Sequence, residues 1–211
     1  MPAIICPTVT AKTREEYAGQ YNKVKNLSSR LHLDFMDKAF TGVKSVALET
    51  AWWQPGPMID LHIMFEKPLE HLETVIKLQP HMVIIHAEAE GVEQFIEEIH
   101  GFGIKIGVSL LAKTSPIKLE DYVRRLDHVL LFSGHLGHFG GQVDLSLLHK
   151  VAALKRMNPR LEIGWDGGIN DENVLELVRG GIDVLNVGGY FQNAENPEDA
   201  YAKLEAKLRE G

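Results

Sequence analysis

Residues 30–37 read Arg-Leu-His-Leu-Asp-Phe-Met-Asp, and the interpretation of the whole chain starts from them. An extended strand sends successive side chains to opposite faces. One face is then apolar and suits packing under helices, because it carries Leu31, Leu33 and Phe35. The other face carries an imidazole, a carboxylate and a thioether, namely His32, Asp34 and Met36. A strand that only packs in a core has no need of such a polar face.

A second stretch repeats this pattern. In Asp60-Leu-His-Ile-Met64, Asp60, His62 and Met64 alternate with apolar residues. Two strands that each offer histidine and methionine to a shared interior, with acids beside them, suggest a metal site inside a sheet or barrel.

Composition limits the classes of function. The chain has 211 residues, of which 45% are hydrophobic and 24% charged, as in ordinary globular proteins. Its net charge of −7 argues against nucleic acid as a partner, because binding the phosphate backbone needs clustered lysine and arginine. No apolar run approaches the roughly 20 residues of a membrane span, and the N-terminus lacks the features of a signal peptide. A single cysteine excludes an internal disulfide. We expect a cytoplasmic protein without a membrane partner. The bulky pair Trp52-Trp53 could form a subunit contact, so a homo-oligomer is a possible state.

Apolar strands alternate with helical patterns along the chain. The expected strands cover 3–9, 30–37, 58–64, 82–86, 104–111, 129–132, 161–165 and 184–187. The expected helices lie at 13–26, 68–76, 91–101, 116–126, 144–157, 170–179 and 197–208. Nearly continuous apolar strands call for a parallel sheet covered by helices, and eight of them suit a closed (β/α)8 TIM barrel. A doubly wound open sheet is the competing fold. Without a linker or low-complexity stretch, we expect one domain over residues 1–211.

Active sites of such barrels lie at the carboxyl ends of the strands. The polar residues expected there include Thr8, the histidines and acids of the two patterned strands, His86, Glu88, the loop 133–142 and Asp166. Histidines and carboxylates with thioethers nearby suit one divalent ion such as Zn²⁺, Fe²⁺, Mn²⁺ or Co²⁺, and the sequence does not choose among them.

Glycine pairs follow the sixth, seventh and eighth expected strands. They are Gly140-Gly141, Gly167-Gly168 and Gly188-Gly189. Backbone amides in such turns can approach an anion closely, and a phosphate site after the last two strands is common in this architecture. We therefore expect a small phosphorylated ligand.

In this order and spacing, the motifs resemble those of the ribulose-phosphate 3-epimerase family. The family's His-x-Asp-x-Met-Asp and Asp-x-His-x-Met patterns are similar to 32–37 and 60–64, and its His-x-Glu-Ala pattern to 86–89. Further likenesses lie at 103–109, 139–142, 166–168 and 187–189.

The resemblance implies a (β/α)8 barrel with a divalent metal held by His32, Asp34, His62 and Asp166. It also implies that Asp34 and Asp166 are the acid/base pair that moves a proton between the two faces of a carbon beside a ketone, while the metal stabilises the enediolate. The expected substrate-binding residues are Thr8, Met36, Met64, Gly140, Gly141, Gly167, Gly168, Gly188 and Gly189.

Two loops depart from the family pattern. The family continues after its second strand with Gly-x-Phe-Val-Pro-Asn, whereas this chain has Lys38-Ala-Phe-Thr41. After the sixth strand, Phe132-Ser-Gly-His-Leu-Gly-His138 replaces a methionine and Pro-Gly, which adds His135 and His138. The last turn also has Gly189-Tyr190 where the family has serine and a small residue. The chain is therefore interpreted as a divergent member of the family.

The expected function is a metal-dependent sugar-phosphate 3-epimerase, most simply one that interconverts D-ribulose 5-phosphate and D-xylulose 5-phosphate in the pentose phosphate pathway. Two alternatives stay open: an epimerase of a different ketose phosphate, and a non-catalytic barrel that binds a phosphosugar. Related barrel decarboxylases and aldolases carry Asp-x-Lys-x-x-Asp on a strand, and Asp34-Phe-Met-Asp37 lacks that lysine.

Overall fold

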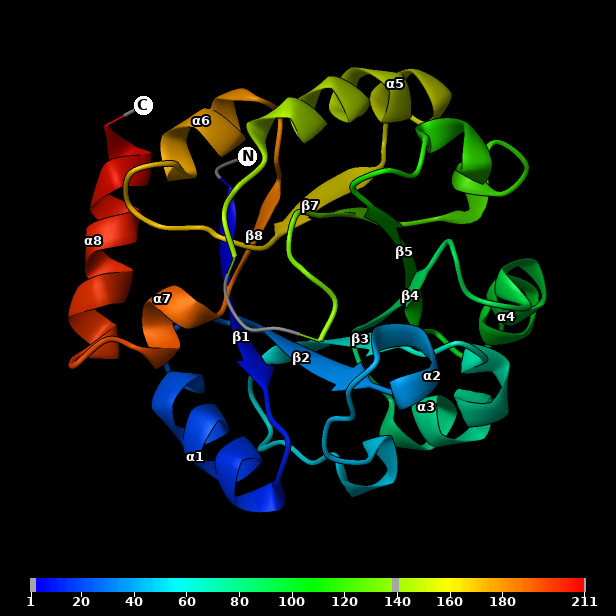
Figure 1. The fold of residues 1–211 in the computed structure, drawn as a ribbon, viewed down its shortest axis with the longest axis horizontal. Helices are drawn as coiled ribbons and strands as arrows, with labels where there is room; N and C mark the ends of the chain where they lie inside the picture. The colour runs from blue at the N-terminus through cyan, green and yellow to red at the C-terminus, as the bar shows by residue number, and fades with distance from the viewer. Residues whose placement is uncertain (1–2, 138–140, 211) are drawn as a thin grey trace.

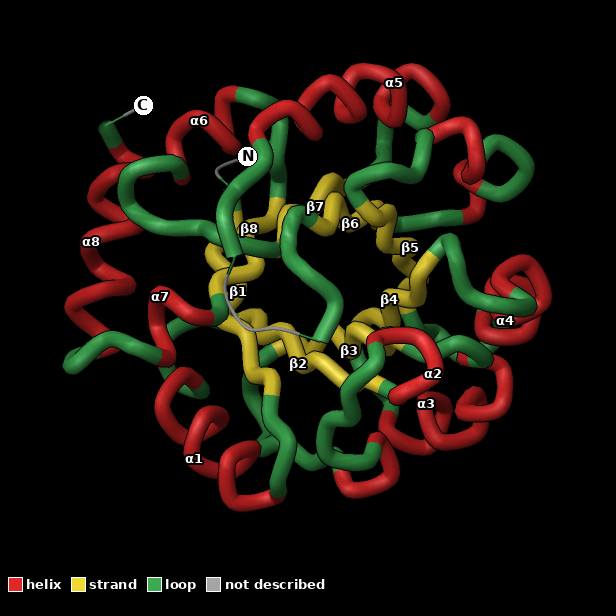
Figure 2. Tube along the Cα trace, in the orientation of Figure 1, coloured by secondary structure: helices red, strands yellow, loops and turns green. Residues whose placement is uncertain are grey.

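The apolar segments form the parallel strands of a closed barrel in a computed structural model that describes residues 3–137 and 141–210. Strand order follows the chain, and the last strand pairs with the first. Figure 2 shows the strands as a central ring with the helices outside it. The strands are β1 (Ile4–Thr10), β2 (Arg30–Met36), β3 (Met58–Met64), β4 (Met82–His86), β5 (Lys105–Leu111), β6 (His128–Phe132), β7 (Glu162–Asp166) and β8 (Val184–Val187). The predicted (β/α)8 fold is confirmed.

Helices and short 3-10 turns connect the strands and cover the barrel from outside (Figure 1). The α-helices are α1 (Arg14–Val24), α2 (Lys38–Thr41), α3 (Leu72–Leu78), α4 (Val92–Ile99), α5 (His149–Met157), α6 (Val174–Arg179), α7 (Gly189–Gln192) and α8 (Pro197–Arg209). The 3-10 turns are η1 (Leu48–Thr50), η2 (Pro68–His71), η3 (Pro116–Leu119), η4 (Val123–Arg125) and η5 (Leu145–Leu148). Among the described residues, none of these helices has the length and apolar character needed to cross a membrane.

Strand β2 separates its side chains as the alternation predicts. Leu31, Leu33 and Phe35 are fully buried and belong to the main hydrophobic core, which also includes buried residues of the covering helices. The Phe35 ring lies 6.2 Å from that of Tyr17 on α1, so this face packs against the helix layer. The polar side chains of the same strand are therefore left to the barrel interior.

Local sequence signals set the helix ends. Thr13 begins α1 with the predicted capping box, in which its hydroxyl accepts from the Glu16 amide and the Glu16 carboxylate accepts from the Thr13 amide. Helix α8 begins at Pro197 after Asn196, whose side chain accepts from two amides of the first turn.

Four predicted helices differ from the structure. The segments 68–76 and 144–157 begin with the 3-10 turns η2 and η5, which precede α3 and α5. The segment 116–126 forms the 3-10 turns η3 and η4 instead of an α-helix. Its buried residues recur three and four positions apart, and this periodicity does not distinguish an α-helix from successive 3-10 turns. Helix α6 begins after Asn173 rather than Asn170, because the Asn170 side chain accepts from the amides of Glu172 and Asn173 and caps the preceding turn.

Four charged or polar side chains meet inside the barrel at the amino ends of the strands. We call Arg30, Asp60, His128 and Glu162 the barrel-bottom network. Arg30 donates from Nε to Asp60 at 2.6 Å and from both terminal nitrogens to Glu162 at 3.0 and 2.8 Å. His128 Nδ1 lies 2.8 Å from Glu162. The network links β2, β3, β6 and β7 at the end of the barrel opposite the carboxyl ends of the strands.

Candidate active site

Two histidines and two aspartates converge at the carboxyl ends of β2, β3 and β7. His32, Asp34, His62 and Asp166 each offer one ligand atom, and these atoms all lie within 4.8 Å of one another. Parallel pairing sets this arrangement, because Asp34 and His62 are directly opposite each other in the β2–β3 register. The structure thus brings together the four residues that the sequence predicted as metal ligands.

Asp34 lies at the centre of the cluster. Its Oδ1 is 3.0 Å from His62 Nδ1 and 3.1 Å from His32 Nε2, and its Oδ2 accepts a 2.5 Å hydrogen bond from the Thr10 hydroxyl. Burial alone would raise the pKa of Asp34, but its contacts with His32 and His62 outweigh burial and hold the pKa well below its usual range. Asp34 is therefore a carboxylate at neutral pH.

Asp166 faces the same cluster in a different electrostatic environment. Its Oδ2 lies 3.9 Å from His62 Nδ1. Burial, followed by the negative charge of Asp34, raises the pKa of Asp166 to about 7. The two carboxyl groups thus have opposite tendencies to hold a proton, as in many acid/base pairs.

A chain of side chains behind His62 orients its ring. His62 Nε2 lies 3.0 Å from His86 Nε2, and His86 Nδ1 lies 3.4 Å from Glu88. Glu88 is fixed in turn, because it accepts hydrogen bonds from the Leu111 amide and the Thr114 hydroxyl. Burial is the main cause that lowers the pKa of His86 to about 4, so His86 is neutral and can accept a hydrogen from His62 Nε2. With a cation bound, that tautomer would present the lone pair of His62 Nδ1 to the metal.

The chemistry of the cluster fits a divalent cation. The His32 ring is fully buried, and neither Nδ1 nor Nε2, the nitrogen that faces Asp34, makes a hydrogen bond among the described residues. Two imidazoles and two carboxylates form a mixed nitrogen and oxygen donor set, which Zn²⁺, Fe²⁺, Mn²⁺ and Co²⁺ all accept. A bound cation would also offset the repulsion between two carboxylates that share one buried site.

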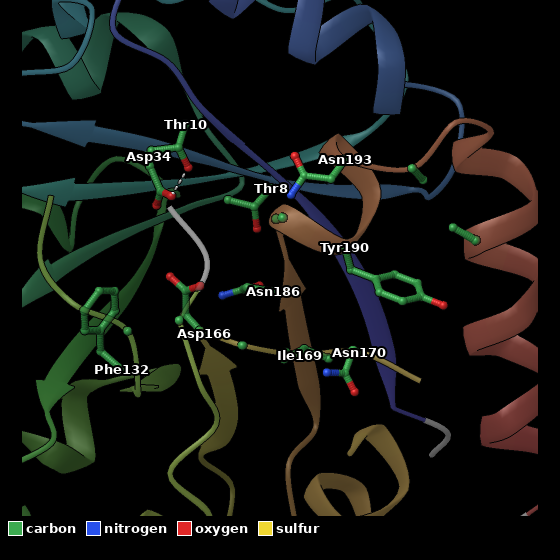
Figure 3. Close-up of a pocket in the computed structure, with 18 of the residues that line it drawn as sticks. Thr8, Thr10, Asp34, Phe132, Asp166, Ile169, Asn170, Asn186, Tyr190 and Asn193 are labelled. Atoms are coloured by element: carbon green, nitrogen blue, oxygen red, sulfur yellow. Dashed lines mark hydrogen bonds between the residues drawn. The ribbon is translucent and has the colours of Figure 1, made fainter. Parts of the chain in front are cut away.

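A cavity of about 670 Å³ opens beside the cluster, and both aspartates line it (Figure 3). It is also lined by nearly all the residues that the sequence predicted to bind substrate, namely Thr8, Met36, Met64, Gly141, Gly167, Gly168, Gly188 and Gly189. Gly140 belongs to the same prediction and lies outside the described residues. Substrate binding by this set stays a prediction, although its members share one cavity.

Two of the glycines in this set are required by the packing of a loop. Gly167 and Gly168 have φ angles of 111° and 74°, which side chains rarely adopt. A Cβ at Gly167 would lie 2.5 Å from the Gly134 nitrogen, and one at Gly168 would lie 2.5 Å from the Val143 nitrogen. The turn after β7 therefore fits closely under the loop that follows β6.

The loops that depart from the family pattern contact each other near the cavity. A Cβ at Gly137, in the loop after β6, would lie 2.5 Å from a Val43 methyl and 3.0 Å from the Thr41 carbonyl oxygen, both after β2. Phe40 of α2 also packs against the His86 ring at 4.9 Å. His135, predicted near the mouth, belongs to this loop, and His138 lies outside the described residues.

Sequence reasoning missed several residues of the cavity wall. Thr10, Phe132, Asn170, Asn186, Tyr190, Asn193 and Lys203 all line it. The alternation of side chains along a strand could have predicted Thr10, since it follows Thr8 on the same strand at a spacing of two and so shares its face. Helix α7 was also missed, because a helix of four residues that begins within a glycine pair gives no detectable periodicity.

The sequence is similar over nearly its whole length to one family. The model described as "Ribulose-phosphate 3 epimerase family" matches residues 4–192. A protein of Helicobacter pylori named ribulose-phosphate 3-epimerase is 29% identical, covering 95% of this chain and 96% of its own length. One of Aquifex aeolicus with the same name is 30% identical, covering 84% of each chain.

Solved structures share the fold at much lower sequence identity. The structure of 3-keto-L-gulonate-6-phosphate decarboxylase from Vibrio cholerae superposes with a TM-score of 0.74 and 12% identity, covering 100% of this chain and 99% of that one. At this identity the likeness concerns the barrel alone.

Proposed function

Since the chain belongs to the ribulose-phosphate 3-epimerase family, we propose that it is a metal-dependent 3-epimerase of a phosphorylated ketose. The simplest reaction is the interconversion of D-ribulose 5-phosphate and D-xylulose 5-phosphate. One observation carries the proposal: Asp34 and Asp166, on strands that are not neighbours, place two carboxyl groups beside two histidines at one cavity.

Epimerisation at C3 requires a proton to leave one face of the carbon and another to reach the opposite face. In one direction, the Asp34 carboxylate accepts the C3 proton and the electron pair of the C–H bond delocalises into the adjacent ketone as an enediolate. Asp166, in its protonated form, then donates a proton to the other face. In the reverse direction the two residues exchange roles.

Other side chains of the site hold this pair in place. Thr10 donates to Asp34 Oδ2, and the Gln20 side chain holds Thr10 by hydrogen bonds to both its backbone amide and its carbonyl group. Met36 and Met64 line the cavity with groups that neither donate nor accept protons. A cation held by His32, Asp34, His62 and Asp166 would supply positive charge to stabilise the developing enediolate.

The proposal is tested by hydrogen exchange. The metal-loaded protein is incubated with D-ribulose 5-phosphate in D₂O, and deuterium at C3 is followed by NMR. We expect incorporation into both D-ribulose 5-phosphate and D-xylulose 5-phosphate. Exchange only with another ketose phosphate would identify a different substrate. No exchange with any ketose phosphate, together with measurable binding of one, would instead support a non-catalytic phosphosugar-binding barrel.

The cation is tested by replacing His62 with alanine. We expect the wild-type protein to carry about one divalent ion per chain and the His62→Ala variant to lose it, because a ligand and its oriented lone pair are removed. Elemental analysis of the purified proteins measures this directly. His100→Ala, at an exposed histidine, is the matched control. A His62→Ala variant with undiminished metal content would remove His62 from the ligand set.

The contact between Thr10 and Asp34 is tested by Thr10→Val, which keeps the shape of the side chain and removes its hydroxyl. A hydrogen bond to a charged group contributes about 1.5–3 kcal/mol, so we expect kcat/KM to fall about 10- to 100-fold. Loss of the donor should also raise the pKa of Asp34. Thr10→Ser restores the hydroxyl and should recover most of the rate; equal losses in both variants would contradict the assignment.

A further inference from the structure

Asn186 is a buried polar residue of the cavity wall that no step above uses. Its side chain is 2% exposed and lines the cavity. It is opposite Asp166 in the β7–β8 register, so the two side chains are neighbours on the inner wall of the barrel. Figure 3 shows the Asn186 side chain beside Asp166, with Thr8 above it.

The amide of Asn186 is unsatisfied. Neither Oδ1 nor Nδ2 has a hydrogen-bond partner in the described part of the chain, and the buried hydroxyl of Thr8 lacks one as well. Buried polar groups are nearly always paired, because an unpaired one loses its hydration without compensation. Strand β8 is otherwise apolar, with Val184, Leu185 and Val187 around Asn186. An apolar residue at this position would avoid the unpaired amide, so the presence of asparagine points to a ligand.

We infer that Asn186 binds the C4 hydroxyl group of the ketose phosphate and thereby selects the substrate; this inference rests on the proposed function. An amide presents one acceptor and two donor hydrogens, and a hydroxyl is both donor and acceptor, so the two groups are complementary.

The position of Asn186 along the wall selects C4 among the hydroxyls. In a 2-ketose 5-phosphate, C4 lies between the reacting C3 and the phosphorylated C5. Asn186 is the strand neighbour of Asp166, which acts at C3, and it lies two residues before Gly188, which follows β8. If the phosphate binds at the glycine turns that follow β7 and β8, the C4 hydroxyl lies beside Asn186. The C1 hydroxyl lies on the other side of C3.

The test combines Asn186→Leu with substrates that lack one hydroxyl group. Leucine is close to asparagine in shape and has no polar atom, so the melting temperature should stay the same or rise. Rates of C3 exchange and calorimetric dissociation constants are measured for D-ribulose 5-phosphate and its 4-deoxy and 1-deoxy analogues. We expect Asn186→Leu to weaken binding of the parent substrate about 10- to 100-fold and to leave binding of the 4-deoxy analogue unchanged. For the 1-deoxy analogue, the substitution should reduce affinity by the same factor as for the parent substrate.

Three results would overturn the inference. The first is that Asn186→Leu leaves kcat/KM and the dissociation constant of the parent substrate unchanged. The second is that the variant loses equal affinity for the parent and for the 4-deoxy analogue. The third is that the variant binds the 1-deoxy analogue as tightly as wild type does. Asn186→Ala, which introduces no new bulk, repeats the test if the leucine variant does not fold. Asn22→Leu makes the same chemical change at an exposed position of α1 and should alter nothing. Failure of the wild-type protein to exchange would count against the proposed function, while the dissociation constants would still test Asn186.

Discussion

Replacing Asp34 or Asp166 with asparagine is expected to lower the rate of C3 epimerisation by about 10²- to 10⁴-fold, the usual contribution of a positioned acid or base. Asparagine has the size of aspartate but cannot accept or donate the proton. Both residues are needed because each serves one face of C3. A single remaining carboxyl group can return the proton only to the face from which it came.

The experiment follows epimerisation and deuterium incorporation at C3 separately, together with the metal content of each variant. Asp121→Asn, an exposed substitution of the same kind, is the matched control. A variant that keeps its ion and its melting temperature but loses epimerisation supports the acid/base role. If either asparagine variant epimerises at the wild-type rate, that residue is not an acid/base group of the reaction.

Replacing Arg30 with methionine is expected to destabilise the fold by about 3–5 kcal/mol, since removing one partner of a buried ion pair leaves the other charge uncompensated. The Asp60 carboxylate is 1% exposed and its Oδ1 has no partner among the described residues, so Arg30 provides its main compensation. Arg30 also binds both oxygens of Glu162. Hydrogen bonds and charge interactions of Glu162 with His128 and Arg30 outweigh its burial and hold its pKa well below its usual range.

Urea unfolding of the purified variants measures this effect. Arg179→Met, at an exposed position of α6, should change the free energy of unfolding by less than about 0.5 kcal/mol. The double variant Arg30→Met with Asp60→Leu removes both charges of the pair and should recover much of the loss. A single Arg30→Met variant as stable as wild type would show that the barrel-bottom network does not contribute to stability.

The fold could be predicted from sequence because its signals are local. The polar and apolar faces of β2 follow from a spacing of two, and the capping box of α1 lies within four residues. Such patterns depend only on residues close together in the chain, so they can be recognised without knowing the tertiary structure. They also predicted that Asp34 and His62 face the barrel interior, since strand ends of a parallel barrel share one mouth.

The contacts between distant segments could not be predicted in the same way. Arg30 begins the stretch with which the sequence analysis opened, yet its partner Glu162 is 132 residues away. Pairing depends on the register of strands that are not neighbours in the chain, and local periodicity carries no information about it. Asn186 was missed for a different reason: β7 and β8 are consecutive strands, but the register that places Asn186 beside Asp166 is not visible in the periodicity of either strand.

The contact between Gly137 and Val43 has a consequence for how this protein could evolve. Gly137 has a φ of 77° and no space for a side chain, because Val43 and the Thr41 carbonyl oxygen occupy that space. A larger residue at 137 becomes acceptable only after the segment that follows β2 has changed and the backbone at 137 has left its positive φ. Substitutions in these two loops are therefore expected to show epistasis, so that evolution toward a new sugar would need paired changes made in a particular order.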